Sequence, residues 1–384
     1  MRFIPLLLVI GILPLLLTGC WGLREIEHLA YVNSIGIDYV KGKVVFYTQM
    51  ISFNNIAKKE AGAGMSKEVV SIGKGEGRTV DEAIFDLYKT SQQRLAWSHV
   101  KTIAFTEAAL REDVIHGVLD QMDRYYEFRY TIWTMATHGS IEDIFSTSPT
   151  QNMSTLYSQL NNPRDRYSQS SLVAPLYLYK FIWKWDENSK ILLLPELSVN
   201  ETSWLENKKP SPQLQQDGVC VMQNKQLLGC FKIDEIMGLR WMEKETVRTP
   251  LMLQVDNKPI AMMVVKKIKP SIEPKLANGK LTFHIKVKME GSVTEQEKPA
   301  RESDLKELAE KEIRKQIQKT YLVGLKSDAD LLGLSDSLYR SNPKEWHRLV
   351  KNGSLPLKPE SLGEIDVSIG ITDVGIAKIL KKKD

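Results

Sequence analysis

The chain has 384 residues, of which 42% are hydrophobic and 26% are charged, and its formal net charge is +5. This length exceeds one typical hydrophobic core, so two or three domains are expected. The net charge is too small to indicate a nucleic-acid-binding protein, and the sequence has neither an arginine-rich stretch nor a nucleic-acid-binding motif.

The first twenty residues have the layout of an export signal. Arg2 precedes an apolar run from Phe3 to Leu17, and the run leads into Leu17-Thr18-Gly19-Cys20. A membrane-spanning helix needs about 17 to 25 apolar residues, whereas a shorter run that ends in small residues is typical of a cleaved signal peptide. The final four residues resemble the lipobox of bacterial lipoproteins. The resemblance implies that residues 1–19 are removed and that Cys20 carries a lipid with fatty-acyl chains such as palmitate; an unlipidated secretory signal is the alternative.

Residues 20–149 predict an N-terminal α+β domain. Hydrophobic alternation and turn residues predict strands at residues 31–38, 43–51, 68–77, 100–105 and 128–136, with helices at 80–88 and 108–125. Thr79 and Glu82 have the spacing of a capping box. Gly73-Lys-Gly-Glu-Gly77 matches no phosphate-binding pattern, so we expect a strand-to-helix turn whose glycines serve the backbone conformation.

Residues 150–210 predict a middle domain or connector. Residues 172–185 are rich in aromatics, and their period is ambiguous: Tyr177, Tyr179 and Phe181 alternate as in a strand, while Leu172, Tyr179 and Trp183 fall on one helical stripe. A short strand is expected at residues 191–199. Residues 206–216 contain two prolines and many polar groups, which indicates a linker.

Residues 211–384 predict a C-terminal α+β domain with a large antiparallel sheet packed against a long amphipathic helix. Strands are expected at residues 251–255, 260–268, 280–291 and 365–372, and the helix at 303–323. Pro270 and Pro274 indicate an edge or a bulge, because proline cannot donate to a strand ladder. Asn342-Pro343 predicts the start of another helix.

Two cysteines, Cys220 and Cys230, lie in a predicted hairpin that begins this domain. A three-residue loop at Asn224-Lys225-Gln226 pairs Gln223 with Leu227 and places the two cysteines opposite each other, where a disulfide would fit. A two-residue loop would shift the register and separate them. The alternatives are therefore a disulfide, which export would permit, and two buried thiols.

Catalytic and metal-binding patterns are missing from the sequence. The six histidines show no metal-ligand spacing, and no nucleophile motif occurs. We therefore expect no enzyme activity, no cofactor and no metal site.

An ordered series of segments resembles the Ger(x)C family, the C subunits of spore nutrient germinant receptors. The segments are Cys20–Ala30, Ser34–Asp38, Gly77–Ala83, Asp120–Arg124, Gly218–Gly229, Ile236–Trp241, Asp328–Gly333 and Pro343–Trp346. The two hairpin cysteines depart from the family, which usually has other small or apolar residues there.

The resemblance implies three α+β domains and a helix, rather than a strand, at residues 172–185. It also implies a lipoprotein on the outer face of the spore's inner membrane, assembled with an A subunit and a membrane-spanning B subunit. It supplies no catalytic residues. A free-standing extracytoplasmic solute-binding lipoprotein is the alternative function, although that class usually has two α/β lobes.

Overall fold

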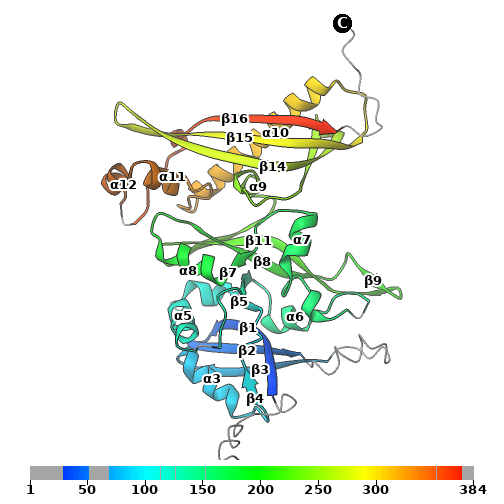
Figure 1. The fold of residues 1–384 in the computed structure, drawn as a ribbon, viewed down its shortest axis with the longest axis vertical. Coiled ribbons are helices and arrows are strands. Elements are labelled where there is room, and N and C mark those ends of the chain that lie inside the picture. Colours follow the sequence, from blue (N-terminus) through cyan, green and yellow to red (C-terminus); the bar gives the residue numbers. More distant parts are fainter. Residues whose placement is uncertain are drawn as a thin grey trace, which may run out of the picture.

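The computed structural model describes residues 29–51, 69–112, 114–125, 127–151, 153–351 and 353–373. The signal segment, Cys20 and the C-terminal lysines lie outside the described residues. Figure 1 shows an elongated molecule with the N-terminal strands at one end and the C-terminal sheet at the other. Within the described part of the chain, no helix combines the length and the apolar character needed to cross a membrane.

The larger sheet has ten strands, and its main path runs β12-β11-β8-β6-β5-β1-β2-β3. Its strands are β1 (Leu29–Val40), β2 (Lys43–Ile51), β3 (Val70–Gly77), β4 (Arg94–Ala96), β5 (Thr102–Thr106), β6 (Trp133–Thr137), β7 (Leu176–Tyr177), β8 (Leu192–Asn200), β11 (Gln213–Gln223) and β12 (Gln226–Lys232). Strands β1, β5, β6 and β8 are mutually parallel along this path. Their carboxyl ends therefore meet at one edge.

Short helices cover this sheet. They are α3 (Val80–Tyr88), α4 (Glu107–Arg111), α5 (Val114–Arg124), α6 (Ile141–Ser146), α7 (Pro163–Gln169) and α8 (Leu178–Asp186), with a 3₁₀ turn, η3, at Thr155–Tyr157. A small hairpin of β9 (Leu205–Glu206) and β10 (Lys209–Pro210) lies within the expected linker. The expected helix at 108–125 is divided into α4 and α5, because Glu112 adopts an extended conformation.

The ambiguous aromatic segment is helical from Leu178 onward, as the family resemblance implied. Leu178, Phe181 and Trp185 are buried at helical spacing, whereas Tyr179 and Trp183 face solvent. Burial on a single helical face outweighs the two-residue alternation, which would have exposed half of these large side chains.

Two local predictions before α3 need correction. Thr79 caps the helix as expected and accepts a hydrogen bond from the Glu82 amide at 3.2 Å, but the Glu82 carboxylate accepts from the amide of Arg78 and not from that of Thr79. The glycines of β3 serve close packing and not an unusual backbone. A Cβ on Gly75 would lie 2.2 Å from the carbonyl oxygen of Ala83, so glycine lets α3 approach the strand.

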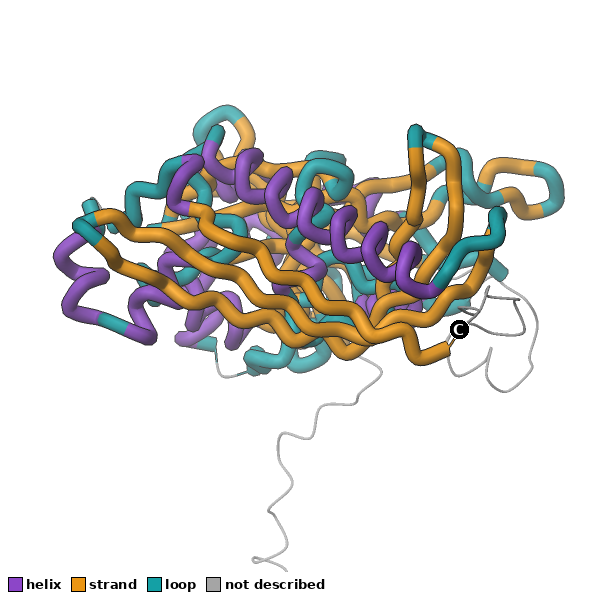
Figure 2. Tube along the Cα trace, turned by 90° about the horizontal axis from the view of Figure 1, so that it is seen from above, coloured by secondary structure: helices purple, strands orange, loops and turns teal. Residues whose placement is uncertain are grey.

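The C-terminal sheet has four strands in the order β13-β14-β15-β16 and packs against one long helix, α10 (Glu302–Leu325). Its strands are β13 (Thr249–Val255), β14 (Lys258–Ala277), β15 (Lys280–Gln296) and β16 (Leu362–Asp373). Figure 2 shows α10 lying across the strands. Leu305, Ala309, Ile313 and Ile317 form its buried stripe. These features confirm the α+β class and the helix-on-sheet C-terminal unit, although β16 is parallel to β15.

The prolines of β14 lie in an edge segment next to a bulge. Strand β13 pairs only with residues 258–265 of β14, so Pro270 and Pro274 have β15 as their one neighbouring strand among those described. The register shifts between Lys266 and Lys269, where Lys267 has a φ of 52°. Both expected devices therefore occur, and no central ladder bond is lost at the prolines.

Four further short elements complete the C-terminal unit: α9 (Leu239–Met242), α11 (Leu334–Ser341), α12 (Pro343–Leu349) and the 3₁₀ turn η4 (Pro359–Ser361). Asn342 caps α12 and accepts from the Glu345 amide at 3.2 Å.

The cysteine hairpin differs from its expected place. β11 and β12 extend the ten-stranded sheet through β8 and do not join the C-terminal sheet. Apolar residues of the hairpin instead form a shared core with residues of the C-terminal unit, including Ala329 and Leu331. The expected boundary at residue 211 thus divides one continuous sheet, since strand partners are set by contacts distant in sequence.

Candidate functional site

The parallel strands bring a polar cluster to one edge of the ten-stranded sheet. Thr106 ends β5 and caps α4, accepting a hydrogen bond from the Ala109 amide at 3.2 Å, so Glu107 begins the helix at this edge. His138 follows β6 directly. Because β5 and β6 are parallel and adjacent, the two side chains emerge side by side.

A third member, Glu196, comes from β8 at the seam between two parts of the sheet. Strands β6 and β8 pair only through Ala136 and Glu196. The Glu196 side chain is 4% exposed, and Gly218 on β11 leaves room for it: a Cβ there would lie 2.2 Å from Glu196 Oε2. The glycine is therefore required by the buried carboxyl group.

His138 links the two carboxyl groups. Its Nδ1 lies 2.8 Å from Glu107 Oε2, and its Nε2 lies 2.8 Å from Glu196 Oε1. Glu107 also pairs with Arg111. His138 is 53% exposed, so one face of the cluster is open to solvent.

Burial sets the protonation of Glu196. Desolvation raises the pKa of its carboxyl group to about 7, with the neighbouring charges of Asp217 and Glu107 acting in the same direction and His138 opposing them. The carboxyl group therefore exchanges its proton near neutral pH.

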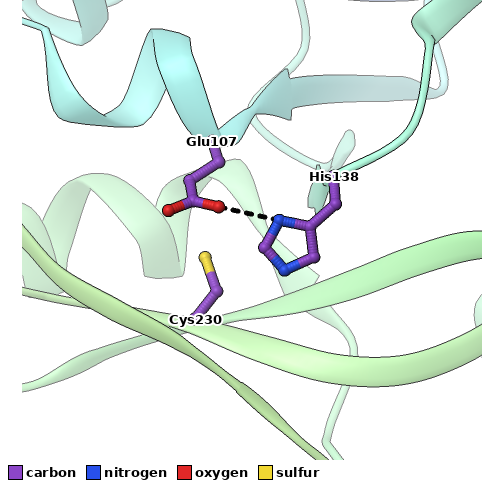
Figure 3. A group of neighbouring side chains, drawn as sticks. All are labelled: Glu107, His138 and Cys230. Carbon is purple, nitrogen blue, oxygen red and sulfur yellow. Dashed lines mark ion pairs between the residues drawn. The ribbon is translucent and has the colours of Figure 1, made fainter.

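The cysteine hairpin completes the cluster. Cys220 and Cys230 are directly opposite each other, with their Cα atoms 4.0 Å apart, and they are joined by a disulfide bond. Figure 3 shows the Cys230 sulfur pointing toward Glu107 and His138. One ligand atom from each of these three side chains lies within 4.8 Å of the other two. We call Glu107, His138, Glu196 and Cys230 the junction cluster.

The hairpin reaches this register by an unexpected route. The loop is a two-residue turn at Asn224-Lys225, with Gln223 opposite Gln226, and not the expected three-residue loop. Both turn residues have positive φ, as a type I′ turn requires. A register shift after Met222 and Leu227 then inserts one residue and restores the pairing of Cys220 with Cys230.

Sequence patterns did not indicate the junction cluster, because its members come from four separate elements. The one available signal was that Glu107 and His138 each follow a parallel strand. The other sequence-derived site, Cys20, lies outside the described residues.

A second concave feature lies between the hairpin and α10. This cleft of about 780 Å³ is lined by both basic and acidic side chains, among them Arg166, Lys232, Lys315, Asp217 and Glu312. Its mixed charge favours no single ligand class.

Comparison with known proteins identifies the family. A family model described as the spore germination protein N-terminal domain matches residues 22–199, and one described as the spore germination B3/GerAC-like C-terminal domain matches residues 217–375. Among curated proteins of Bacillus subtilis (strain 168), spore germination protein KC is 26% identical, over 90% of this chain and 89% of its own length. Spore germination protein B3 is 24% identical, over 94% of this chain and 95% of its own.

A solved structure has the same fold. The crystal structure of the GerBC protein matches with a TM-score of 0.56 and 19% identity, covering 91% of this chain and all of that chain. The two family models, together with curated relatives aligned over nearly the whole chain, show that this protein belongs to the GerAC-like family of spore germination proteins.

Proposed function

We propose that this chain is the lipid-anchored C subunit of a spore nutrient germinant receptor. The observation that carries the proposal is the match of both family models, in order, downstream of a lipobox-like Cys20. The mature protein would act by docking with an A and a B subunit on the outer face of the spore's inner membrane, without enzyme activity of its own.

The lipid has a physical role in this proposal. A single acyl chain binds membranes with only about 10⁴ M⁻¹, whereas two chains hold a protein firmly. Confinement beside the other subunits raises their effective concentration without new contacts. The protein surfaces then need only to supply specificity.

Cys20→Ala tests the anchor. We expect this variant to lose acylation and to leave the membrane fraction of spores, with its far-UV spectrum unchanged. Thr18→Ser, which keeps the L-[AST]-[GA]-C pattern, is the matched control and should stay in the membrane. The measurements are mass spectrometry of the mature N-terminus and membrane fractionation. A Cys20→Ala protein retained on membranes at the wild-type level would refute lipid as the main anchor.

Crosslinking in spore membranes tests the partners. The expected result is recovery of A and B receptor subunits in adducts with this chain. The alternative, a free-standing solute-binding lipoprotein, predicts no such adducts and a direct heat of binding when amino acids or sugars are titrated into the purified chain. The cleft beside α10 is the place where that binding would occur.

A further inference from the structure

We propose that Glu107, His138 and Cys230 form a site for a divalent transition metal, best suited to Zn²⁺, which becomes available when the Cys220–Cys230 disulfide is reduced. The proposal is independent of the receptor function. It assigns two exclusive states to one sulfur atom: bonded to Cys220, or bonded to metal.

The chemistry of the three side chains fits zinc. Carboxylate oxygen, imidazole nitrogen and thiolate sulfur are its usual protein ligands, at about 2.0 Å for oxygen and nitrogen and about 2.3 Å for sulfur. In a tetrahedron these bonds place ligand atoms about 3.3 to 3.5 Å apart. The Glu107–His138 contact of 2.8 Å must therefore lengthen slightly, and the sulfur must approach from within the 4.8 Å that now bounds the group.

The surroundings can accommodate that adjustment. Glu107 is 25% exposed, and His138 is half exposed, so both can rotate without disturbing a packed core. The open face leaves a fourth position for water. Reduction frees Cys230 to turn away from Cys220.

Glu196 occupies the position of a supporting carboxylate. With metal on His138 Nδ1, the Nε2–H would donate to Glu196 Oε1, which is already 2.8 Å away. Metal-bound histidines commonly have such a carboxylate partner, which fixes the ring orientation and strengthens the ligand. The cluster thus has a supporting residue as well as three ligands.

The switch between states balances as follows. A dithiol gives two electrons and two protons to the Sγ–Sγ bond, so that two thiols form on this chain and one disulfide forms on the reductant. Zn²⁺ then displaces the Cys230 thiol proton to solvent and binds the thiolate. Reoxidation of the pair reverses both steps and expels the metal.

The test measures binding of Zn²⁺ alone to the full chain carrying Cys20→Ala, so that Cys220 and Cys230 are the two cysteines present. Equilibrium dialysis with metal analysis gives the stoichiometry, and Co²⁺ substitution reports sulfur ligation through its charge-transfer absorption. A trialkylphosphine reduces the disulfide, becomes the phosphine oxide with oxygen from water, and adds no competing thiol.

We expect one Zn²⁺ per reduced chain and none per oxidised chain. Cys220→Ser should bind Zn²⁺ without reductant, because Cys230 is then permanently a thiol. Cys230→Ser should abolish the sulfur-to-cobalt band and weaken binding at least a hundredfold. Glu196→Gln should weaken it about 10- to 100-fold.

His116→Ala, on an exposed turn of α5, is the matched control for His138→Ala and should bind as the parent does. Equal binding by the oxidised and reduced parent would overturn the proposal. So would full binding by Cys230→Ser or His138→Ala. If Cys220→Ser proves unfolded by far-UV circular dichroism, the comparison of oxidised with reduced parent decides the question alone.

Discussion

Glu196 is a buried carboxyl group at the narrowest point of the ten-stranded sheet. One residue pair joins β6 to β8, and Glu196 is half of that pair. A buried ionised carboxylate is costly, so the folded state favours the protonated form. The seam is thus the place where fold stability and pH are coupled.

Glu196→Gln should flatten the dependence of stability on pH. The folded pKa of Glu196, about 7, lies above its ordinary value of 4.5. The folded state therefore binds more protons than the unfolded state between these values, and stability falls as pH rises through this window, by about 3 kcal/mol in all. Urea unfolding at pH 5 and pH 8 checks this, with exposed Glu297→Gln as control. Parallel pH profiles for wild type and Glu196→Gln would contradict it.

Trp346 is the second residue whose role follows from its surroundings. It is 5% exposed, and its Nε1–H donates to Ser335 Oγ at 2.8 Å. Trp346→Ala should destabilise the C-terminal unit by about 3 to 5 kcal/mol, because it leaves a large cavity and an unpaired hydroxyl group. Trp204→Ala, at a side chain that is 56% exposed, should change stability by less than about 0.5 kcal/mol. Similar melting temperatures for the two variants would exclude a core role for Trp346.

At the scale of elements, the β11–β12 hairpin shows how a turn and a bulge act together. The Asn224-Lys225 turn satisfies the strand twist, and the inserted residue restores the cysteine register. Neither device alone would place Cys220 opposite Cys230. The expected pairing was therefore obtained through a loop of a different length.

Reduction of this hairpin should lower the free energy of unfolding by about 2 to 3 kcal/mol, the chain-entropy value for so short a loop. The cysteines are 10 positions apart. Denaturant unfolding with and without reductant measures the effect, and a double Cys220→Ser, Cys230→Ser variant should be insensitive to reductant. Two free thiols in non-reducing mass spectrometry of the native protein would show that the bond is absent.

At the scale of the molecule, two sheets share one apolar contact region. Val219, Val221 and Phe231 of the hairpin pack in the same buried cluster as Ala329 and Leu331 from the C-terminal unit. Lys190 adds an ion pair across this region, with its Nζ 2.7 Å from Asp336 Oδ1. The two sheets are therefore mechanically coupled.

Leu331→Ala should uncouple them. Removing this buried side chain costs about 2 to 5 kcal/mol at the contact region. We expect scanning calorimetry to show one transition for the wild type and two for the variant. Leu322→Ala, at an exposed leucine of α10, is the control. Two transitions already present in the wild type would show that the sheets unfold independently.

Local patterns in the sequence were sufficient for much of this structure. The amphipathic stripe of α10, the Asn342 cap and most strands follow from hydrophobic period and capping residues, which act between neighbours in the chain. The same locality explains the errors. The period of residues 172–185 was ambiguous until burial on one face decided it, and the loop length of the cysteine hairpin depended on a bulge.

By itself, the sequence determined the family, the α+β class and the position of the lipobox-like Cys20, because these are carried by residues read in order. Only the tertiary structure decided that the cysteine hairpin joins the ten-stranded sheet and that Glu107, His138, Glu196 and Cys230 meet at its edge. Strand partners and clusters are set by contacts between residues far apart in the chain. No local spacing encodes such contacts.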